Sequence, residues 1–284
     1  MARVKIVTDS TADLPLEIRE KLGIEMVPLK VHFGEETFYD SVDINSSEFY
    51  QKLGQSNELP TTSQPSPVDF MDIYKEICDQ PETSVLSIHL SAALSGTYQS
   101  AMLAKSLLEN QSKVVLVDSK SACYGLGLLV IAAAEAAQAG KSMEEIQALV
   151  MQLRKKTRIY FIVDTLEYLY KGGRIGKASA MFGSLLNIKP ILTVDSSGEV
   201  DSVDKVRGHK KALRRIIELL QKEFEGQSIN VCIGHSEASE SAEEMFNLIN
   251  DHFQVNRHSY THIGPVIGTH VGAGAIAVFV TPSA

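Results

Sequence analysis

The stretch from residue 85 to residue 139 decides the fold class: VLSIHLSAALSGTYQSAMLAKSLLENQSKVVLVDSKSACYGLGLLVIAAAEAAQA. It contains two short apolar runs, 85–88 and 114–117, and a longer helix-like run follows each of them, 97–109 and 121–139. Short runs rich in valine, leucine and isoleucine are typical of buried strands. Helices that alternate with buried strands are typical of a parallel sheet, so we expect an α/β protein.

The same alternation extends toward the N-terminus. Residues 5–8 and 27–33 are predicted to be strands, and the segment from Ser10 to Asp13 is predicted to cap a helix that ends near Gly23. Another helix should begin at 66–69, where proline takes the first helical position. We therefore expect residues 1–158 to form an N-terminal α/β domain with a mostly parallel sheet and flanking helices.

The second half of the chain has a different pattern. A strand, a hairpin, a helix, a strand, a helix and a closing strand are predicted at 160–163, 191–206, 210–224, 230–234, 241–252 and 275–280. The apolar cluster of Met181, Phe182, Leu185, Leu186 and Ile188 is interpreted as a core helix. These elements predict a second, C-terminal α/β domain with a mixed sheet over residues 159–284, so the protein should have two lobes.

Composition excludes several classes of protein. The 284 residues carry a formal net charge of -8, which does not suit a nucleic-acid partner. The longest apolar stretch, 124–134, is too short for a membrane span, and no signal peptide is recognisable, so we expect a cytoplasmic protein with at most transient membrane contact. The three cysteines lie far apart and predict buried thiols.

Two glycine-rich segments resemble nucleotide-binding loops without matching them. The run from Gly172 to Ser179 has Lys171 where a P-loop needs glycine and Ala178 where it needs serine or threonine. The segment from Gly272 to Gly274 introduces a terminal strand and lacks the helix that a dinucleotide fingerprint requires. Neither segment therefore predicts a nucleotide site or a cofactor.

Hydrolytic and metal sites also lack their motifs. Ser95 lies between a predicted strand and a helix, but a nucleophile elbow would need glycine at Ala93 and Thr97. His258 and His262 could share a strand face, yet no metal-binding spacing is present. We expect no metal, no cofactor and no catalytic constellation.

Three hydroxyl-rich turns remain as candidates for a binding site. They lie at 9–11, 60–67 and 94–97, and the first and third follow predicted strands. Loops at the carboxyl ends of parallel strands converge on one crevice, where helix N-termini and hydroxyls can bind an anion. Helix capping is the competing interpretation for Ser10 and Ser95, and an exposed loop is the competing interpretation for 61–63.

Several segments resemble the DegV family, whose fatty-acid-binding members are called FakB in fatty acid kinase systems. The matching segments occur in the family's order over essentially the whole chain: 8–14, 62–65, 94–98, 171–175, 205–208 and 269–272. The resemblance implies the EDD fold and a long-chain fatty acid buried between the two domains. One departure is Ala273, where the family often has proline.

The resemblance also implies roles for particular residues. Thr62 and Ser95 correspond to the hydroxyls that bind the fatty acid carboxylate, and Thr61 and Gly96 flank them. A separate ATP-dependent kinase subunit would phosphorylate the carboxylate, giving acyl phosphate for phospholipid synthesis. Arg174 and His270 are carried over as candidate mouth or kinase-docking residues.

The expected function is thus that of a non-catalytic lipid-binding subunit. The alternative is a small-molecule phosphotransferase or hydrolase that acts on an acidic substrate.

Overall fold

The computed structural model describes residues 3–183 and 188–283, and it contains a parallel four-stranded sheet. The strands lie in the order β2 (Ile24–Val27), β1 (Arg3–Asp9), β6 (Thr83–His89) and β7 (Val114–Asp118). All three pairings are parallel. The alternation of strands and helices around residues 85–139 therefore predicts this layer correctly.

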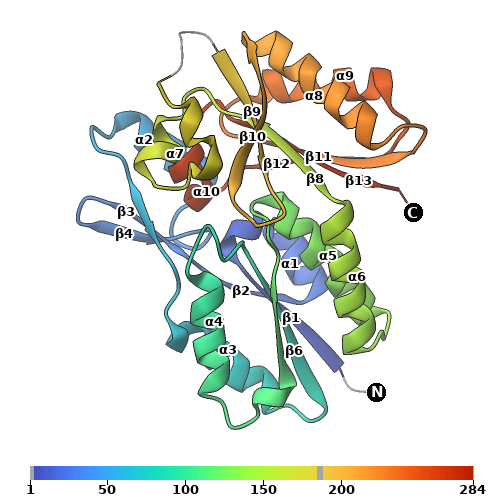
Figure 1. The fold of residues 1–284 in the computed structure, drawn as a ribbon. Helices are drawn as coiled ribbons and strands as arrows, with labels where there is room; N and C mark the ends of the chain where they lie inside the picture. Colours follow the sequence, from blue (N-terminus) through green and yellow to red (C-terminus); the bar gives the residue numbers. More distant parts are fainter. Residues whose placement is uncertain (1–2, 184–187, 284) are drawn as a thin grey trace.

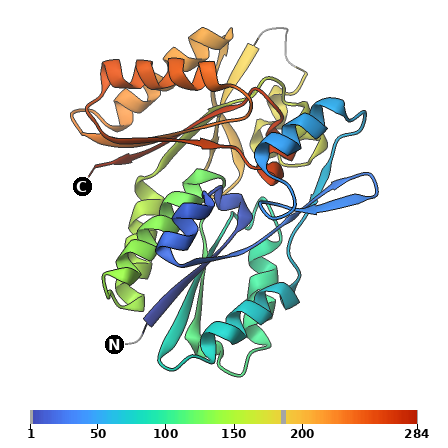
Figure 2. The same ribbon diagram turned by 180° about the vertical axis from the view of Figure 1, so that it is seen from behind.

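Helices cover both faces of the parallel sheet (Figures 1 and 2). On one side lie α1 (Leu16–Leu22), α5 (Tyr124–Gln138) and α6 (Met143–Lys156). On the other lie α3 (Pro67–Cys78) and α4 (Thr97–Ser106). Capping boxes begin α3 at Ser66 and α6 at Ser142, and the start of α3 agrees with the helix expected at 66–69.

A mixed six-stranded sheet forms the upper part of the molecule in Figure 1. Its order is β10 (Val200–Arg207), β9 (Ile188–Val194), β8 (Arg158–Ile162), β13 (Ile276–Pro282), β11 (Ile229–His235) and β12 (Val255–His262). The pairing of β11 with β12 is parallel, and the others are antiparallel. Helices α8 (His209–Glu223) and α9 (Ser239–His252) pack on its outer face, so the predicted mixed sheet is confirmed.

A third sheet was not expected. It has the order β4 (Glu36–Tyr39), β3 (Lys30–Phe33), β5 (Thr61–Ser63), and α2 (Ser46–Gln55) lies between β4 and β5 in the chain. The prediction of one strand over 27–33 is wrong, because Pro28 separates β2 from β3 and has no N–H for a sheet ladder. In the third sheet β5, which carries Thr62, pairs with β3 and contacts α10.

The first turn after β1 also differs from its prediction. Residues Ser10–Ala12 form a short 3-10 helix that Asp9 caps, and α1 starts only at Leu16. The helical conformation is interrupted between them because Asp13 adopts a left-handed conformation, with φ of 50°. Ser10 does not cap a helix; its hydroxyl accepts the Leu29 N–H at 3.1 Å.

The apolar cluster near residue 185 does not form the predicted core helix in the described residues. Met181 ends a 3-10 helix (Gly176–Met181), and Ile188 begins β9. Phe182 is 41% exposed and stacks on Tyr170, which belongs to α7 (Glu167–Lys171). Leu185 and Leu186 lie outside the described residues.

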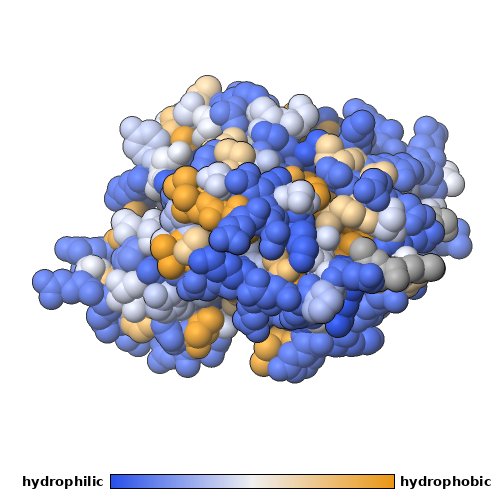
Figure 3. Space-filling view, turned by 90° about the horizontal axis from the view of Figure 1, so that it is seen from below, coloured by the Kyte–Doolittle hydropathy of each residue, from blue (hydrophilic) through white to orange (hydrophobic). Residues whose placement is uncertain are grey.

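The surface offers little continuous apolar area on the face that Figure 3 shows. This face, at the lower end of Figure 1, is mostly hydrophilic, with small separate apolar patches. Over the described parts of the chain, every helix is too short or too polar to cross a membrane. A large apolar ligand would therefore find its contacts in the interior and not on this face.

Candidate functional site

A cavity of about 260 Å³ lies between the six-stranded sheet and the loops that follow β5 and β6. Phe161 of β8 and Ala277 of β13 are directly paired and form part of its floor. Val266 and Ile267 come from α10 (Pro265–Val271), a short helix that packs against α2, β3 and β5. Most of the wall is apolar, so the cavity suits a hydrocarbon chain.

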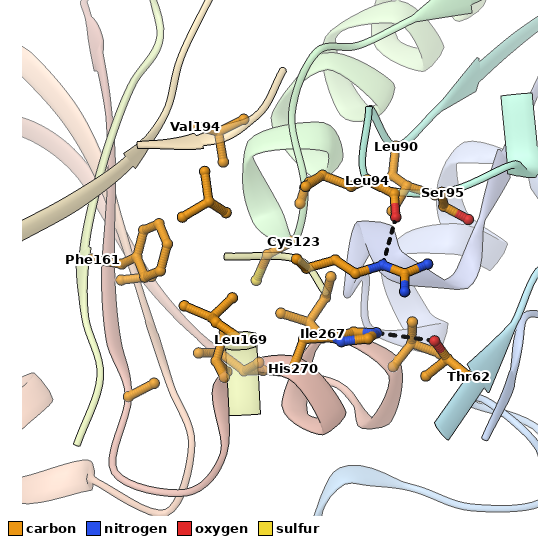
Figure 4. Close-up of a pocket in the computed structure, with 18 of the residues that line it drawn as sticks. Thr62, Leu90, Leu94, Ser95, Cys123, Phe161, Leu169, Val194, Ile267 and His270 are labelled. Carbon is orange, nitrogen blue, oxygen red and sulfur yellow. Dashed lines mark hydrogen bonds between the residues drawn. The ribbon is translucent and has the colours of Figure 1, made fainter. Parts of the chain in front are cut away.

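The polar side chains of the cavity gather at one end (Figure 4). Thr62, Ser95 and His270 lie together there, whereas Phe161 and Val194 lie at the opposite side of the view. Thr62 comes from β5, Ser95 from the loop before α4, and His270 from α10. The fold thus brings together residues that are 208 positions apart in the sequence.

Thr62 and His270 are joined directly. The Thr62 hydroxyl lies 3.0 Å from Nε2 of His270. Burial, and then the positive charge of Arg174, lowers the pKa of His270 to about 4, so the imidazole is neutral at physiological pH. Within the described residues, the buried Nδ1 of His270 has no hydrogen-bond partner.

This environment selects one tautomer of His270. Nδ1 faces Gly172, where a Cβ atom would overlap with it, and an N–H at that position would lack an acceptor among the described residues. The proton of the neutral ring therefore belongs on Nε2, which donates to Thr62 Oγ1. The hydroxyl proton of Thr62 then remains available to a further acceptor in the cavity.

Ser95 and Arg174 form the other side of the polar end. The Ser95 hydroxyl lies 2.9 Å from Thr97 Oγ1 and accepts the Thr97 N–H at 3.3 Å, so it also stabilises the start of α4. Arg174 donates from Nε to the Leu94 carbonyl at 3.0 Å and from Nη1 to the Gly172 carbonyl at 2.8 Å. These bonds use two of the five guanidinium donors and hold a positive charge against the cavity.

The two predicted flanking residues lie beside the cavity wall. Thr61 is exposed, and Gly96 lies beneath the side chain of Gln64. A Cβ at residue 96 would overlap with the Gln64 amide as it lies here, so a larger residue at this position would require the exposed Gln64 side chain to move. Gln64 lines the cavity, but the sequence pattern did not single it out, because only the folded loop brings it over Gly96.

The first hydroxyl-rich turn is not part of the polar end. Ser10 and Thr11 are buried; the Thr11 hydroxyl donates to Asp9 within the turn, and the Ser10 hydroxyl accepts the N–H of Leu29, which precedes β3. Asp9 binds Nδ1 of His89 at 2.9 Å, and both side chains are fully buried. This turn therefore has a structural role beside the parallel sheet, but the capping interpretation of Ser10 is wrong, because Asp9 is the capping residue.

Nucleophilic chemistry has little support among the lining residues. Ser95 bonds to Thr97, whereas a serine nucleophile needs a general base. Cys123 also lines the cavity, but burial, reinforced by the nearby Asp13, raises the pKa of its thiol well above the usual value. A thiol with a raised pKa is inert, so the described polar groups suit binding of an anion better than attack on a substrate.

Comparisons with known proteins identify relatives of this chain over almost its whole length. The family model described as "Uncharacterised protein, DegV family" matches residues 3–283. Protein DegV of Bacillus subtilis is 38% identical over 277 residues, which cover 97% of this chain and 98% of the relative.

Two solved structures with similar folds carry lipid-binding descriptions. A fatty-acid-binding DegV family protein from Thermus thermophilus has a TM-score of 0.92 and 36% identity, covering 99% of this chain and 100% of that chain. A stearic acid-binding protein from Eubacterium ventriosum has a TM-score of 0.90 and 29% identity, covering 98% of both chains. The α/β architecture predicted from the sequence is thus shown, and this chain belongs to the DegV family.

Proposed function

We propose that this protein binds one long-chain fatty acid in the cavity, with the carboxylate at Thr62 and Ser95 and the hydrocarbon tail along the six-stranded sheet. The observation that carries the proposal is the division of one cavity into a polar end and a long apolar remainder. A fatty acid has the same division. The fatty acids bound by related proteins of the family support it further.

The polar end suits a single carboxylate. Thr62 donates its hydroxyl proton because His270 satisfies its oxygen lone pair, and Ser95 offers a second hydroxyl. Arg174 supplies the positive charge that offsets the cost of removing a carboxylate from water. On this proposal Arg174 and His270 are head-group residues, and docking of a partner is a second role for the exposed side of Arg174.

Head and tail contribute differently to affinity. Each buried methylene contributes about 0.8 kcal/mol, so a dozen of them contribute on the order of 10 kcal/mol. A hydrogen bond to a charged group contributes about 1.5–3 kcal/mol. The tail therefore supplies most of the binding free energy, and the hydroxyls fix which end of the ligand lies at the mouth.

We further propose that the carboxylate is presented to a separate ATP-dependent kinase subunit. Thr62, Ser95 and Arg174 are half-buried, so the polar end is accessible from outside. In the reaction a carboxylate oxygen would attack the γ-phosphorus of ATP and release ADP, forming an acyl phosphate for phospholipid synthesis. The partner would supply the nucleotide site, since the run from Gly172 to Ser179 lacks the P-loop residues.

Two experiments test these proposals separately. Organic extraction of the purified protein followed by mass spectrometry should release about one fatty acid per chain; a protein without lipid that also fails to bind added palmitic acid would refute the binding proposal. Incubation of the loaded protein with a fatty acid kinase subunit and ATP should give acyl phosphate, detected as hydroxamate. Lipid retention without any acyl phosphate would refute only the kinase proposal.

Ser95→Ala separates positioning from retention. The variant should retain lipid, because the tail contacts are unchanged, but form acyl phosphate at least tenfold more slowly, because the carboxylate loses one of its two hydroxyl partners. Thr61→Val, a change at an exposed neighbour of Thr62, is the matched control. A lipid-free Ser95→Ala protein beside a lipid-loaded wild type would contradict this division of roles.

A further inference from the structure

One large side chain of β13, Phe279, is among the residues that line the cavity. Alternate residues of the closing strand face the cavity, namely Ala275, Ala277 and Phe279. Ala275 follows α10, the helix that carries His270, so the strand leads away from the polar end. Phe279 lies four residues beyond Ala275, which is about 13 Å at the rise of an extended strand. Two small residues thus leave room for a ligand, and a large one ends that room.

Phe279 is also the wall of a second, separate cleft. This cleft has a volume of about 350 Å³ and lies between α5 and the β11–β12 side of the sheet. Tyr124, Leu128 and Val231 contribute apolar surface to it, and Phe279 is the residue that lines both this cleft and the first cavity. The ring is therefore a partition between two spaces.

The partition is held firmly. Phe279 is 1% exposed, and its ring centroid lies 6.1 Å from that of Tyr124. Cβ atoms added at Gly125 and Gly234 would lie 3.3 Å and 3.2 Å from ring atoms of Phe279, so two glycines give the ring its space on either side. A ring packed this closely does not swing aside easily to admit a longer ligand.

From this arrangement we propose that Phe279 sets the maximum length of the acyl chain that the protein accepts. A chain that starts at Thr62 and follows Ala275 and Ala277 meets the Phe279 ring with its terminal methyl group. Longer chains would have to displace the ring or leave their carboxylate short of the hydroxyls. The inference rests on the proposed fatty acid binding and assigns the length limit of that site to one residue.

The test is the dependence of affinity on chain length. Delipidated protein is titrated with the saturated series myristic, palmitic, stearic, arachidic and behenic acid. Affinity should rise about fourfold for each added methylene, which corresponds to about 0.8 kcal/mol, and should stop rising at the length that reaches Phe279. We call the chain length at which affinity stops rising the break. Phe279→Ala and Phe279→Leu make the partition smaller, so the break should move to longer acids. Ala277→Leu fills space nearer the head group, so the break should move to shorter acids.

Controls keep the outcomes distinct. Phe161→Leu also removes a ring from the cavity wall, but Phe161 does not border the second cleft, so affinities should change without movement of the break. If Phe279→Ala does not fold, as judged by thermal melting, Phe279→Leu and Ala277→Leu decide the matter. A break that stays at the wild-type length in these folded variants overturns the inference alone. A wild-type protein that binds none of the acids overturns the proposed function as well.

Discussion

Replacing Thr62 with valine removes one hydroxyl and keeps the shape of the side chain. On the proposed function the carboxylate loses a hydrogen bond worth about 1.5–3 kcal/mol, so fatty acid should bind about ten- to 150-fold more weakly. Among the residues that the structure describes, His270 has no other side-chain hydrogen-bond partner, and the bond of 3.0 Å between Thr62 Oγ1 and Nε2 is lost in the variant. A buried imidazole without a partner should lower the free energy of unfolding by about 1–3 kcal/mol.

The assay is calorimetric titration of delipidated protein with palmitic acid, together with urea unfolding in the absence of lipid. Thr61→Val makes the same substitution at the exposed neighbour and should change neither quantity by more than about 0.5 kcal/mol. Because the tail contacts are intact, Thr62→Val should still bind measurably. A Thr62→Val protein with wild-type affinity and lowered stability would show that Thr62 supports His270 but does not bind the carboxylate, which would refute the assignment of the head-group end.

Two further predictions concern buried groups around the cavity. Gly172→Ala should lower stability by about 1–3 kcal/mol and weaken lipid binding, because its Cβ would overlap with Nδ1 of His270; Gly54→Ala, at an open position in α2, is the control and should stabilise the protein slightly in the same thermal melts. Burial raises the pKa of Asp40 to about 6, so the folded state holds a proton there that the unfolded state has released, and wild-type stability contributed by this group falls as pH rises from about 4 to about 6. The free energy of unfolding of Asp40→Asn, measured with urea, should therefore rise by about 3 kcal/mol relative to that of the wild type between pH 4 and pH 8. If the difference between the two proteins does not depend on pH, the pKa of Asp40 is not raised in the folded state.

Local patterns predicted the layers of this fold well, because their causes lie within a few residues. The capping boxes at Ser66 and Ser142 depend on side chains three residues apart, and both are present in the structure. The hairpin of β9 and β10 follows from its turn at 196–198. Such features are visible in the sequence because the partners that satisfy the backbone are neighbours in the chain.

The third sheet and α10 could not be found in the same way. Strand β5 has only three residues, Thr61–Ser63, and exists because β3 lies beside it. Helix α10 is short and contains threonine and a glycine, so its intrinsic preference for a helix is weak, and its packing against α2, β3 and β5 holds it in place. Both elements depend on contacts between distant parts of the chain, and both carry residues of the polar end.

The candidate site was predicted unevenly for the same physical reason. The pattern indicated three hydroxyl-rich turns, the family resemblance chose Thr62 and Ser95 among them, and both line one cavity at its polar end. The bond between Thr62 and His270 spans 208 positions, and no local pattern records it. Arg174, which the resemblance gave as a mouth or docking residue, lies against the cavity beside these hydroxyls.

The glycines that resembled a P-loop show how one residue type serves two different kinds of site. In a phosphate-binding loop, glycine lets backbone N–H groups approach the ligand. Here Gly172 lets the His270 ring approach the backbone, and Gly176, with φ of 51°, lies against the backbone of Val200, another lining residue. A Cβ at Gly172 would displace the His270 ring, and a Cβ at Gly176 would displace the backbone of Val200. These two glycines are therefore needed because His270 and Val200, which line the cavity, lie so close to them. The glycine-rich run at 172–179 is explained by close packing and not by a bound nucleotide.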